Sequence, residues 1–489
     1  MSTHSHWMQN LPTHNPLNKD LIADAVVVGA GIAGLSTAYQ LVKAGLSVVV
    51  LERDQIGSGE TPRSSAQVTA SLDFLYQELV TIHGREATRL IYQSHTAAIA
   101  EMERMVQTEQ LDCDFRRVSG HLVPAPGDDA TVQKEASVHR GLGFDTRLST
   151  PPAWVKGFAE SLEYPQQGQV DPLQYLLGLA KAIEKHGGLI YGSSPVLSYT
   201  GDHVVTEQGH TVHANHVVIT TNAVVSEHGK YSFRLTPYRT YMVSLKLTEQ
   251  IEPVLFYDTS DPYFYVRPDG DMLLVGGADH RTGEPADPKE RWQTIESWAR
   301  AHFPVGERLE QWSGQVFNSA DGIAFLGKTG DIYVITGDTG NGLTHATIGS
   351  MIIRDQVLGQ ENPWIEVYRP DRFPRGNYRA WIKDAGRSIG HVFDWFKKSA
   401  EVQNLQPGQG CIVRQGLSKC AVHRDEKGEL HAVGAMCTHL GCEVSWNGAE
   451  HTWDCPCHGS RFASDGTVLT GPARAPLAKL EHPEKLELK

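Results

Sequence analysis

Two short boxes of cysteine and histidine near the C-terminus hold the residues of this chain best suited to chemistry. The first box is Cys437-Thr438-His439 and the second is Cys455-Pro456-Cys457-His458. Two thiolates (Cys437, Cys455) and two imidazoles (His439, His458) form the ligand set of a two-iron, two-sulfur centre in which thiolates bind one iron and histidines the other. Such a centre exchanges one electron at a time.

Structural zinc is the alternative for these ligands, because Cys/His sets at short spacing also bind that metal. The histidine follows its cysteine by two residues in the first box and by three in the second, which departs from the usual zinc-ribbon pairs. Between the boxes, Asn447-Gly448 separates two short alternating segments and predicts a β-hairpin. Such a hairpin would place both boxes side by side, which favours the iron–sulfur interpretation.

Residues 405–489 resemble the Rieske family in these boxes and in the residues that follow them. The resemblance implies a disulfide between Cys442 and Cys457 that ties the two loops together. Two buried free thiols are the alternative, since cytoplasmic proteins rarely keep disulfides. The resemblance also makes Ser460 a hydrogen-bond donor to a cluster sulfide. Phe462 stands where high-potential relatives carry tyrosine, which predicts a lower reduction potential here.

A second redox unit is indicated near the N-terminus by a buried strand that runs into a glycine-rich turn. The turn reads Gly29-x-Gly31-x-x-Gly34 and opens a helix over 35–43, followed by a strand that ends at Glu52. In a dinucleotide fingerprint the glycines permit a tight turn and a close approach to the pyrophosphate, and the acidic residue accepts hydrogen bonds from the ribose. The segment predicts further cofactor contacts at Ile32, Ala33 and Arg53.

Two further segments resemble the D-amino-acid/amine oxidase (DAO) superfamily, which implies FAD. Residues 57–67 are rich in small residues, and the strand at 331–336 ends in a glycine-rich turn that opens a helix over 344–358. That helix N-terminus would suit the flavin pyrimidine, where negative charge develops on reduction. No cysteine lies between Cys113 and Cys411, so we expect a non-covalent flavin. The implied FAD contacts are Thr61, Arg63, Ser64, Ser65, Gln67, Gly337, Gly340, Asn341, Gly342 and Leu343.

Substrate residues follow from the resemblance alone. Members of this superfamily oxidise the carbon–nitrogen bond of amines and amino acids. Arg239 and Arg267 are candidates to bind a substrate carboxylate, and Tyr257, Tyr263 and Tyr265 are candidate walls of the site. The alternative for each arginine is a surface ion pair. His345 is either a general base or a residue of the helix cap.

The predicted fold is an α/β Rossmann-like FAD-binding domain with an α+β substrate domain, plus a C-terminal all-β Rieske domain. We expect a polar tail over 1–22, the oxidoreductase domain over 23–365, a linker with a docking helix over 366–402, and the Rieske domain over 403–489. Within the oxidoreductase domain, 23–75, 160–225 and 315–360 would bind FAD, and 76–159 and 226–314 would form the substrate part. Amphipathic helices are predicted over 86–110 and 288–303.

Composition excludes several other classes of protein. The 489 residues carry a formal net charge of −13 and no basic run, which argues against nucleic-acid binding. The first twenty residues lack an apolar signal core, and no long apolar stretch predicts a membrane span. We therefore expect a cytoplasmic protein. The implied disulfide is the one feature that disagrees with this expectation, because cytoplasmic proteins rarely keep disulfides.

The combined expectation is an FAD-dependent dehydrogenase of an amine or amino acid that passes electrons to the Rieske centre and then to an external one-electron partner. The imidazoles of His439 and His458 would form an exposed electron port. Two alternatives stay open at this point. One is a flavin hydroxylase that is reduced through the cluster, and the other is a redox sensor or electron carrier.

Overall fold

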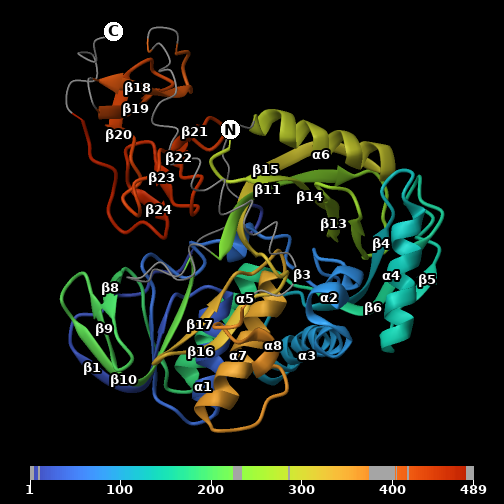
Figure 1. Ribbon diagram of the computed structural model, residues 1–489, viewed down its shortest axis with the longest axis horizontal. Coiled ribbons are helices and arrows are strands. Elements are labelled where there is room, and N and C mark those ends of the chain that lie inside the picture. Colours follow the sequence, from blue (N-terminus) through green and yellow to red (C-terminus); the bar gives the residue numbers. More distant parts are fainter. Residues whose placement is uncertain are drawn as a thin grey trace.

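The computed structural model describes residues 5–8, 11–223, 234–284, 287–373, 402, 405–415 and 418–480. A large α/β body carries a smaller C-terminal β-lobe, which lies beside β8–β9 and beside β11 and β15 (Figure 1). The docking helix predicted within 366–402 falls almost entirely outside the described residues. Among the described residues, no helix combines the length and the apolar character needed to cross a membrane.

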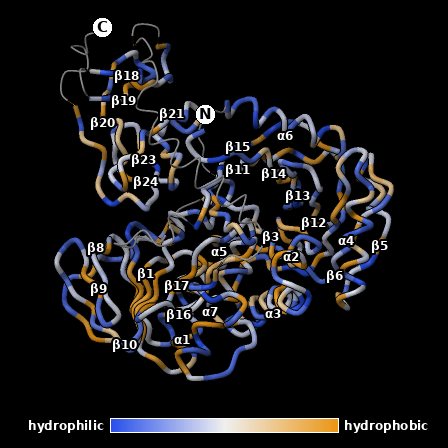
Figure 2. Tube along the Cα trace, viewed as in Figure 1, coloured by the Kyte–Doolittle hydropathy of each residue, from blue (hydrophilic) through white to orange (hydrophobic). Residues whose placement is uncertain are grey.

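Sheet A forms the core of the predicted nucleotide-binding part. Its main order is β16-β17-β10-β1-β2-β7, parallel except for β16, and β9 adds to β10 and pairs with β8. Its parallel strands are apolar along most of their length because both faces are covered (Figure 2). The strands are β1 (Leu21–Val28), β2 (Val48–Leu51), β7 (Leu189–Tyr191), β8 (Val196–Tyr199), β9 (His203–Thr206), β10 (Thr211–Asn222), β16 (Phe325–Thr329) and β17 (Ile332–Thr336).

Helices cover one face of sheet A and the ends of neighbouring strands cover the other. The helical face packs Val27 and Val50 against α1 (Ile32–Lys43), α5 (Pro172–Lys185) and α7 (Gly342–Val357). On the opposite face, Leu235 and Phe317 pack against Val26 and Val334. The glycine-rich turns that precede α1 and α7 therefore both follow parallel strands, at the edge where such sheets bind nucleotides.

Sheet B forms the predicted substrate part, in the order β15-β11-β14-β13-β12-β4-β6-β3, with β5 paired to β6. All pairs are antiparallel except β12 with β4. The strands are β3 (Gln67–Val68), β4 (Arg116–Val123), β5 (Arg147–Ser149), β6 (Ser161–Gln169), β11 (Leu235–Leu247), β12 (Leu255–Asp258), β13 (Phe264–Asp269), β14 (Met272–Arg281) and β15 (Val305–Ser319).

The two faces of sheet B have different partners. Tyr241, Val243 and Val275 point toward α6 (Pro288–His302), with which they share a core. The alternate residues, including Met242 and Leu274, join the core of the nucleotide-binding body. We call this second side the inner face of sheet B. It is the face that can line a site next to a flavin.

Among the described residues, the body also contains four further helices and one 3-10 turn. They are η1 (Thr61–Arg63), α2 (Tyr76–His83), α3 (Arg85–Glu109), α4 (Asp129–Leu142) and α8 (Ile365–Tyr368). The helices predicted over 86–110 and 288–303 correspond to α3 and α6.

The C-terminal lobe is all-β, as predicted. One sheet has the order β18 (Gly410–Gln415), β19 (Ser418–Arg424), β20 (Leu430–Gly434), and the other runs β21 (Ser445–Asn447), β22 (Thr452–Asp454), β23 (Arg461–Ala463), β24 (Val468–Thr470). The hairpin predicted between the boxes is β21–β22, with Trp446 opposite Trp453. Trp453 and Phe462 pack with four cysteines in the core of this lobe.

The N-terminal segment, predicted as a polar tail, is partly packed onto the body. Trp7 is 5% exposed, and its Nε1 donates a hydrogen bond to the Ser64 carbonyl oxygen at 3.1 Å. The guanidinium of Arg267 lies 4.9 Å from the centre of the Trp7 ring. One tryptophan in a polar segment supplies this anchor.

Candidate redox centre and flavin site

Each cysteine–histidine box folds as one tight turn, and the two turns have matching backbone hydrogen bonds. In the first, Gly441 N donates to Cys437 O at 2.9 Å and Cys437 N to Cys442 O at 2.8 Å. In the second, Gly459 N donates to Cys455 O at 3.0 Å and Cys455 N to Ser460 O at 2.8 Å. Both turns contain a glycine with positive φ, which closes them without strain.

The four predicted ligands come together at the tips of these turns. The rings of His439 and His458 are 5.0 Å apart and nearly perpendicular. Cys437 and Cys455 carry buried free thiols, and the hydrogen bond from the Cys455 thiol lowers the pKa of Cys437 below its ordinary value. The structure thus brings the two thiols together and the two imidazoles together, and the assignment of these four residues as ligands of one cluster stays a prediction.

An unsatisfied nitrogen supports metal ligation at this point. The Nδ1 atom of His439 is buried and has no hydrogen-bond partner within the part of the chain that the structure describes. A buried polar atom without a partner is costly, and an iron ion would satisfy it. Ser460 lies beside the Cys437 sulfur, and its Oγ also accepts a hydrogen bond from Ala473 N at 3.0 Å.

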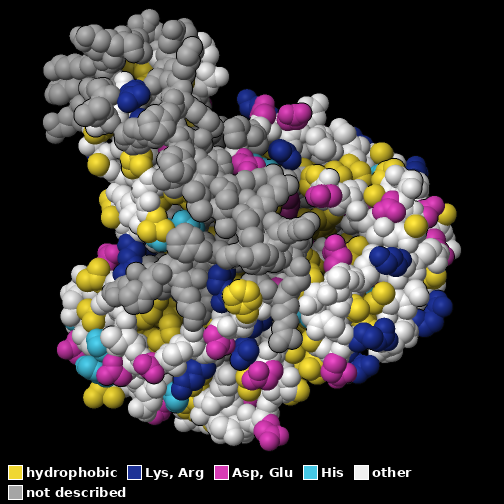
Figure 3. All heavy atoms as spheres, in the orientation of Figure 1, with side chains coloured by type: hydrophobic (Ala, Val, Ile, Leu, Met, Phe, Trp, Pro, Cys, Tyr) yellow, Lys and Arg dark blue, Asp and Glu magenta, His cyan; other side chains and the backbone are white. Residues whose placement is uncertain are grey.

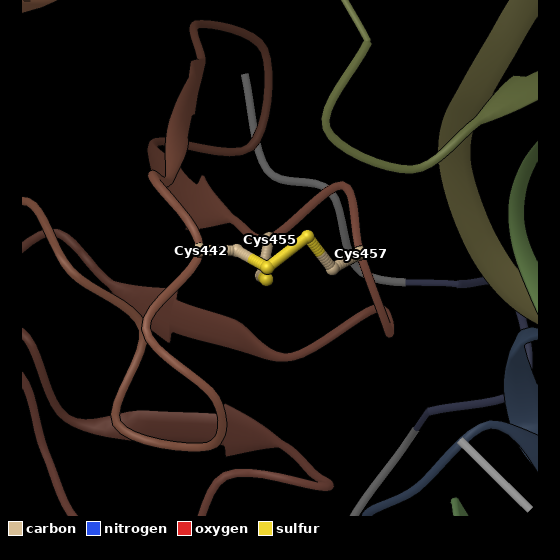
Figure 4. Close-up of side chains that lie close together, drawn as sticks. All are labelled: Cys442, Cys455 and Cys457. Atoms are coloured by element: carbon tan, nitrogen blue, oxygen red, sulfur yellow. A yellow bond between two sulfur atoms is a disulfide. The ribbon is translucent and has the colours of Figure 1, made fainter. Parts of the chain in front are cut away.

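The implied disulfide is present. Cys442 and Cys457 are bonded, with their Cα atoms 6.4 Å apart, and Cys455 lies next to the bridge (Figure 4). Each half of the bridge comes from a different box, so the two ligand loops are covalently joined.

The second ligand loop rests directly on the body of the protein. Gln315 Nε2 on β15 donates a hydrogen bond to Gly459 O at 2.8 Å. A Cβ atom at Gly459 would lie 2.6 Å from the Pro237 side chain, and one at Gly283 would lie 2.6 Å from Pro456 N. Two glycines therefore permit this close approach between the lobe and the body.

A buried ion pair joins the lobe and the body next to this contact. Arg239 Nη2 on β11 lies 2.6 Å from Glu450 Oε2 in the lobe, and Arg461 Nη2 lies 2.7 Å from the same oxygen. Burial alone would raise the pKa of Glu450, but Arg239 and Arg461 outweigh it and lower that pKa to about 2. Arg239, predicted as a substrate ligand, thus has an anionic partner in the C-terminal lobe.

The two ligand histidines differ in exposure. His458 is 6% exposed, since its loop packs against the body. His439 keeps part of its surface accessible, and the neighbouring Leu440 is 50% exposed. The expectation of two exposed imidazoles is therefore wrong for His458, because the body covers its side of the lobe.

The first glycine-rich turn has the geometry of a pyrophosphate site. A Cβ atom at Gly34 would lie 1.8 Å from Gly29 O, so only glycine fits where α1 crosses the turn. Gly31, the residue before α1, has no side chain that could cap the helix, which leaves first-turn amides other than Ile32 N available to a phosphate. Thr61 Oγ1 accepts a hydrogen bond from Ile32 N at 3.1 Å, which brings the 57–67 segment to the same helix end.

Glu52 lies beside this turn as predicted for a ribose ligand. Its Oε2 accepts a hydrogen bond from Ala30 N at 2.7 Å, and its Oε1 accepts one from Asp54 N at 3.0 Å. Burial raises its pKa. The adjacent Arg53 points elsewhere, since its Nη2 donates to Leu469 O in the lobe at 2.8 Å.

The second glycine-rich turn is connected to the end of β3. Asn341 Nδ2 donates to Ser71 O at 3.0 Å, just before α7 begins at Gly342. A Cβ atom at Gly340 would lie 1.8 Å from Asp73 Oδ2. Gly337 and Gly340 both have positive φ, and Leu343 is buried. The predicted flavin turn and the residues after β3 thus share one location.

The remaining predicted FAD residues lie along the segment between η1 and β3. Arg63 O accepts a hydrogen bond from Trp312 Nε1 at 2.9 Å, and Ser64 Oγ donates to Thr61 O at 2.8 Å. Gln67 Nε2 donates to Val266 O at 3.1 Å. Ala33 lies on α1, and Ser65 precedes β3. Their contacts with FAD remain predictions.

Two predicted substrate residues have internal partners. Arg267 Nη1 donates to the carbonyl oxygens of Ser65, Ala66 and Val170 at 3.2, 3.1 and 2.7 Å, and its Nη2 pairs with Asp269. His345 Nδ1 lies 2.8 Å from Asp338 O, its ring packs on that of His95, and burial lowers its pKa to about 4. These contacts favour structural roles for both.

Two acidic residues that were not predicted, Asp73 and Asp279, join the predicted tyrosines on the inner face of sheet B. Tyr263 Oη donates to Asp73 Oδ2 at 2.7 Å, and Tyr265 Oη lies 2.7 Å from Thr240 Oγ1. Burial raises the pKa of both Asp73 and Asp279 to about 7. The only sequence signal is the glycine pair at 276–277 before Asp279, which indicates an irregular strand end.

Comparison with known proteins gives the family. Residues 24–356 match the FAD dependent oxidoreductase family (DAO), and residues 395–481 match the Rieske [2Fe-2S] domain. The chain belongs to the DAO family. It binds FAD and, through its C-terminal Rieske domain, a [2Fe–2S] cluster, which removes the zinc alternative.

Relatives cover both the whole chain and its larger part. YhfW of Bacillus subtilis (strain 168), named as a Rieske 2Fe-2S iron-sulfur protein, is 30% identical over 98% of this chain and 97% of its own length. The gamma-glutamylputrescine oxidoreductase of Escherichia coli (strain K12) is 24% identical over 70% of this chain and 85% of its own. Glycine oxidase from Geobacillus kaustophilus has the same fold, with a TM-score of 0.63 and 19% identity over 72% of this chain and 99% of that one.

Proposed function

We propose that this FAD-dependent oxidoreductase is a dehydrogenase of an amine or amino acid that delivers electrons to its own Rieske cluster and then to an external one-electron acceptor. FAD, when bound, takes a hydride equivalent from the substrate carbon, and the cluster exchanges single electrons. The observation that carries the proposal is the Gln315–Gly459 hydrogen bond, which holds the loop of ligand His458 against the flavoprotein.

A short series of contacts connects the nucleotide turn with the cluster loop. Ile32 N at the start of α1 donates to Thr61 Oγ1 at 3.1 Å. The preceding residue, Glu60, accepts a hydrogen bond from Gln315 N at 2.8 Å. Gln315 then reaches Gly459 through its side chain. The FAD-binding segment and the ligand loop are thus separated by one residue of β15, which supports transfer within one chain.

The different exposure of His439 and His458 supports a direction of electron transfer through the cluster. His458 faces the flavoprotein side, whereas His439 is partly accessible and lies next to exposed Leu440 and Met436. Electrons would reach the cluster on the His458 side and leave on the His439 side. Where Figure 3 shows the surface of the body, acidic and basic side chains are intermixed.

Anaerobic mixing tests the proposal. Purified holoprotein is mixed with a panel of amines and amino acids while the flavin absorbance is followed, and samples are frozen for electron paramagnetic resonance of the reduced cluster. We expect at least one compound to bleach the flavin and then to produce the cluster signal. A protein that consumes dioxygen only when an external reductant is supplied would be a hydroxylase. A protein whose flavin no compound bleaches would be a sensor or carrier, and either result contradicts the proposal.

A further inference from the structure

We infer that the substrate is an organic ammonium cation without a carboxylate, held on the inner face of sheet B by Asp73 and Asp279 among three tyrosines. This inference rests on the proposed function and narrows its substrate from an amine or amino acid to an amine. The tyrosines are Tyr257, Tyr263 and Tyr265. The observations that carry it are the placement of these five residues and an unsatisfied carboxylate oxygen of Asp279.

The register of sheet B places the tyrosines on one side. Tyr257 of β12 is directly opposite Tyr265 of β13, so both side chains share a face. Tyr263 lies two residues before Tyr265, and their rings are 5.7 Å apart. A Cβ atom at Gly276 would lie 2.2 Å from the Tyr265 ring, so glycine makes room for that ring on the inner face.

The acidic residues join this aromatic group from two directions. Asp73 comes from the segment after β3 and accepts the hydrogen bond from Tyr263 Oη at 2.7 Å. Its backbone N lies 3.4 Å from Asn341 Oδ1, at the start of α7. Asp279 comes from β14, close to Thr240 of β11. The group therefore adjoins the turn that the DAO family uses for its flavin.

One polar atom in this group lacks a partner. Asp279 Oδ1 is buried and accepts no hydrogen bond from any residue that the structure describes. Tyr257 is 8% exposed, and its hydroxyl interacts with the side chain of Thr69. A buried carboxylate oxygen without a partner is costly unless a ligand satisfies it. An ammonium group supplies several N–H donors, and aromatic rings favour a neighbouring cation.

Arg239 and Arg267 are each paired with a carboxylate of the protein. Arg239 pairs with Glu450, and Arg267 pairs with Asp269 and also donates to three backbone carbonyls. Arg291 donates to Ala278 O at 3.1 Å, and no ion pair within 4.0 Å involves Asp73 or Asp279 among the described residues. A carboxylate placed here would meet two other carboxylates, which repel it. The geometry therefore selects the amine function and disfavours an amino acid.

Three compounds that cannot be oxidised test binding without turnover. They are tert-butylamine, 2-aminoisobutyrate and pivalate, which share one skeleton and lack a hydrogen on the substituted carbon. Calorimetric titration of the holoprotein at pH 8 should show that tert-butylammonium binds at least about tenfold more tightly than 2-aminoisobutyrate, with no detectable binding of pivalate. Equal or tighter binding of either carboxylate, or no binding of the amine, overturns the inference.

Two variants and a control assign the site. Asp279→Asn and Asp73→Asn should each weaken tert-butylammonium binding at least about tenfold, because a charge-assisted hydrogen bond is lost. Asp271→Asn alters an exposed aspartate that pairs with Lys246 and should leave the affinity unchanged. Flavin content measured on each variant confirms that it is folded. Unchanged affinity in both Asp73→Asn and Asp279→Asn contradicts the assignment.

The matched oxidisable pair separates this inference from the proposed function. Isopropylamine and alanine each restore one hydrogen to the carbon and are mixed anaerobically with the holoprotein. Bleaching of the flavin by alanine alone would overturn the ammonium class while the dehydrogenase function stands. Binding of tert-butylammonium with no bleaching by any amine or amino acid would overturn the dehydrogenase function while the cation site stands.

Discussion

Gln315 on β15 donates a hydrogen bond to the carbonyl oxygen of Gly459, the residue after the cluster ligand His458. The backbone N of the same Gln315 donates a hydrogen bond to the carboxylate of Glu60, next to the segment predicted to bind FAD. One residue of the flavoprotein therefore contacts both the loop of His458 and the residue that precedes the predicted FAD contact Thr61. This relationship suggests that the lobe is docked for electron transfer and not merely tethered by the linker.

Gly283→Ala should separate docking from cluster assembly. The new Cβ would lie 2.6 Å from Pro456 N, so the second ligand loop must move away from the body. A docking cost of about 1.4 kcal/mol or more would lower the docking equilibrium constant at least about tenfold, and the rate of cluster reduction should fall with the docked population. Stopped-flow absorbance under anaerobic conditions measures that rate, and the cluster resonance should be unchanged.

Gly428→Ala is the matched control for this change. Gly428 also has a positive φ of 88°, but a Cβ atom there would meet nothing within 4 Å. It therefore carries the same kind of backbone penalty without displacing the ligand loop. If the rates of cluster reduction fall equally in Gly283→Ala and Gly428→Ala, the close contact between Gly283 and Pro456 does not control electron transfer to the cluster.

Glu450→Gln should destabilise the docked lobe. The change leaves Arg239 and Arg461 without their shared carboxylate in a buried place, which typically costs about 3–5 kcal/mol. Chemical denaturation at pH 7 measures the loss, and Glu426→Gln, an exposed change in the same lobe, is the control. If Glu450→Gln lowers the free energy of unfolding no more than Glu426→Gln does, the ion pairs of Glu450 contribute nothing to stability.

The same carboxyl predicts an acid dependence. The pKa of Glu450 in the folded protein is about 2, below its unfolded value of about 4.3. The stabilisation is therefore complete above the unfolded pKa and is lost as the pH falls toward 2. Denaturation midpoints measured between pH 7 and pH 3 should fall in the wild type and fall less in Glu450→Gln.

Asp279→Asn should stabilise the protein at alkaline pH, although it should weaken the binding of an ammonium substrate. Burial raises the pKa of Asp279 to about 7, with Asp73, Arg291 and Thr240 as its charged and polar neighbours. A raised pKa means that folded stability is lost as the pH rises from about 4 through 7. The melting temperature of Asp279→Asn should exceed that of the wild type by more at pH 8 than at pH 5. The opposite order would show that the carboxylate is not desolvated.

Phe462→Tyr should raise the reduction potential of the cluster. Phe462 is fully buried in one core with Cys437, Cys455 and Trp453. A hydroxyl at this place can donate to a cluster sulfur, and such hydrogen bonds favour the reduced state. Protein-film voltammetry of Phe462→Tyr should show an upward shift that Phe462→Leu lacks. An unchanged or lower potential in the tyrosine variant would contradict this role.

The cluster ligands could be predicted from the sequence because each box is local. Residues within four positions lie in one turn, so spacing alone determines that Cys437 and His439 point to one place. Arg239 shows the limit of such reasoning, since its partner Glu450 is 211 residues away and belongs to another domain. The site at Asp73 and Asp279 was missed for the same reason, because strand register and an irregular end of β14 bring them together.

The concentration dependence of cluster reduction tests the central claim most directly. The holoprotein is mixed anaerobically with excess amine at protein concentrations that span a tenfold range, and the rate of appearance of the reduced cluster is measured. Transfer between FAD and the cluster of the same chain predicts one first-order rate constant at every concentration. A rate that grows in proportion to protein concentration would show that electrons pass between molecules, and it would contradict the account.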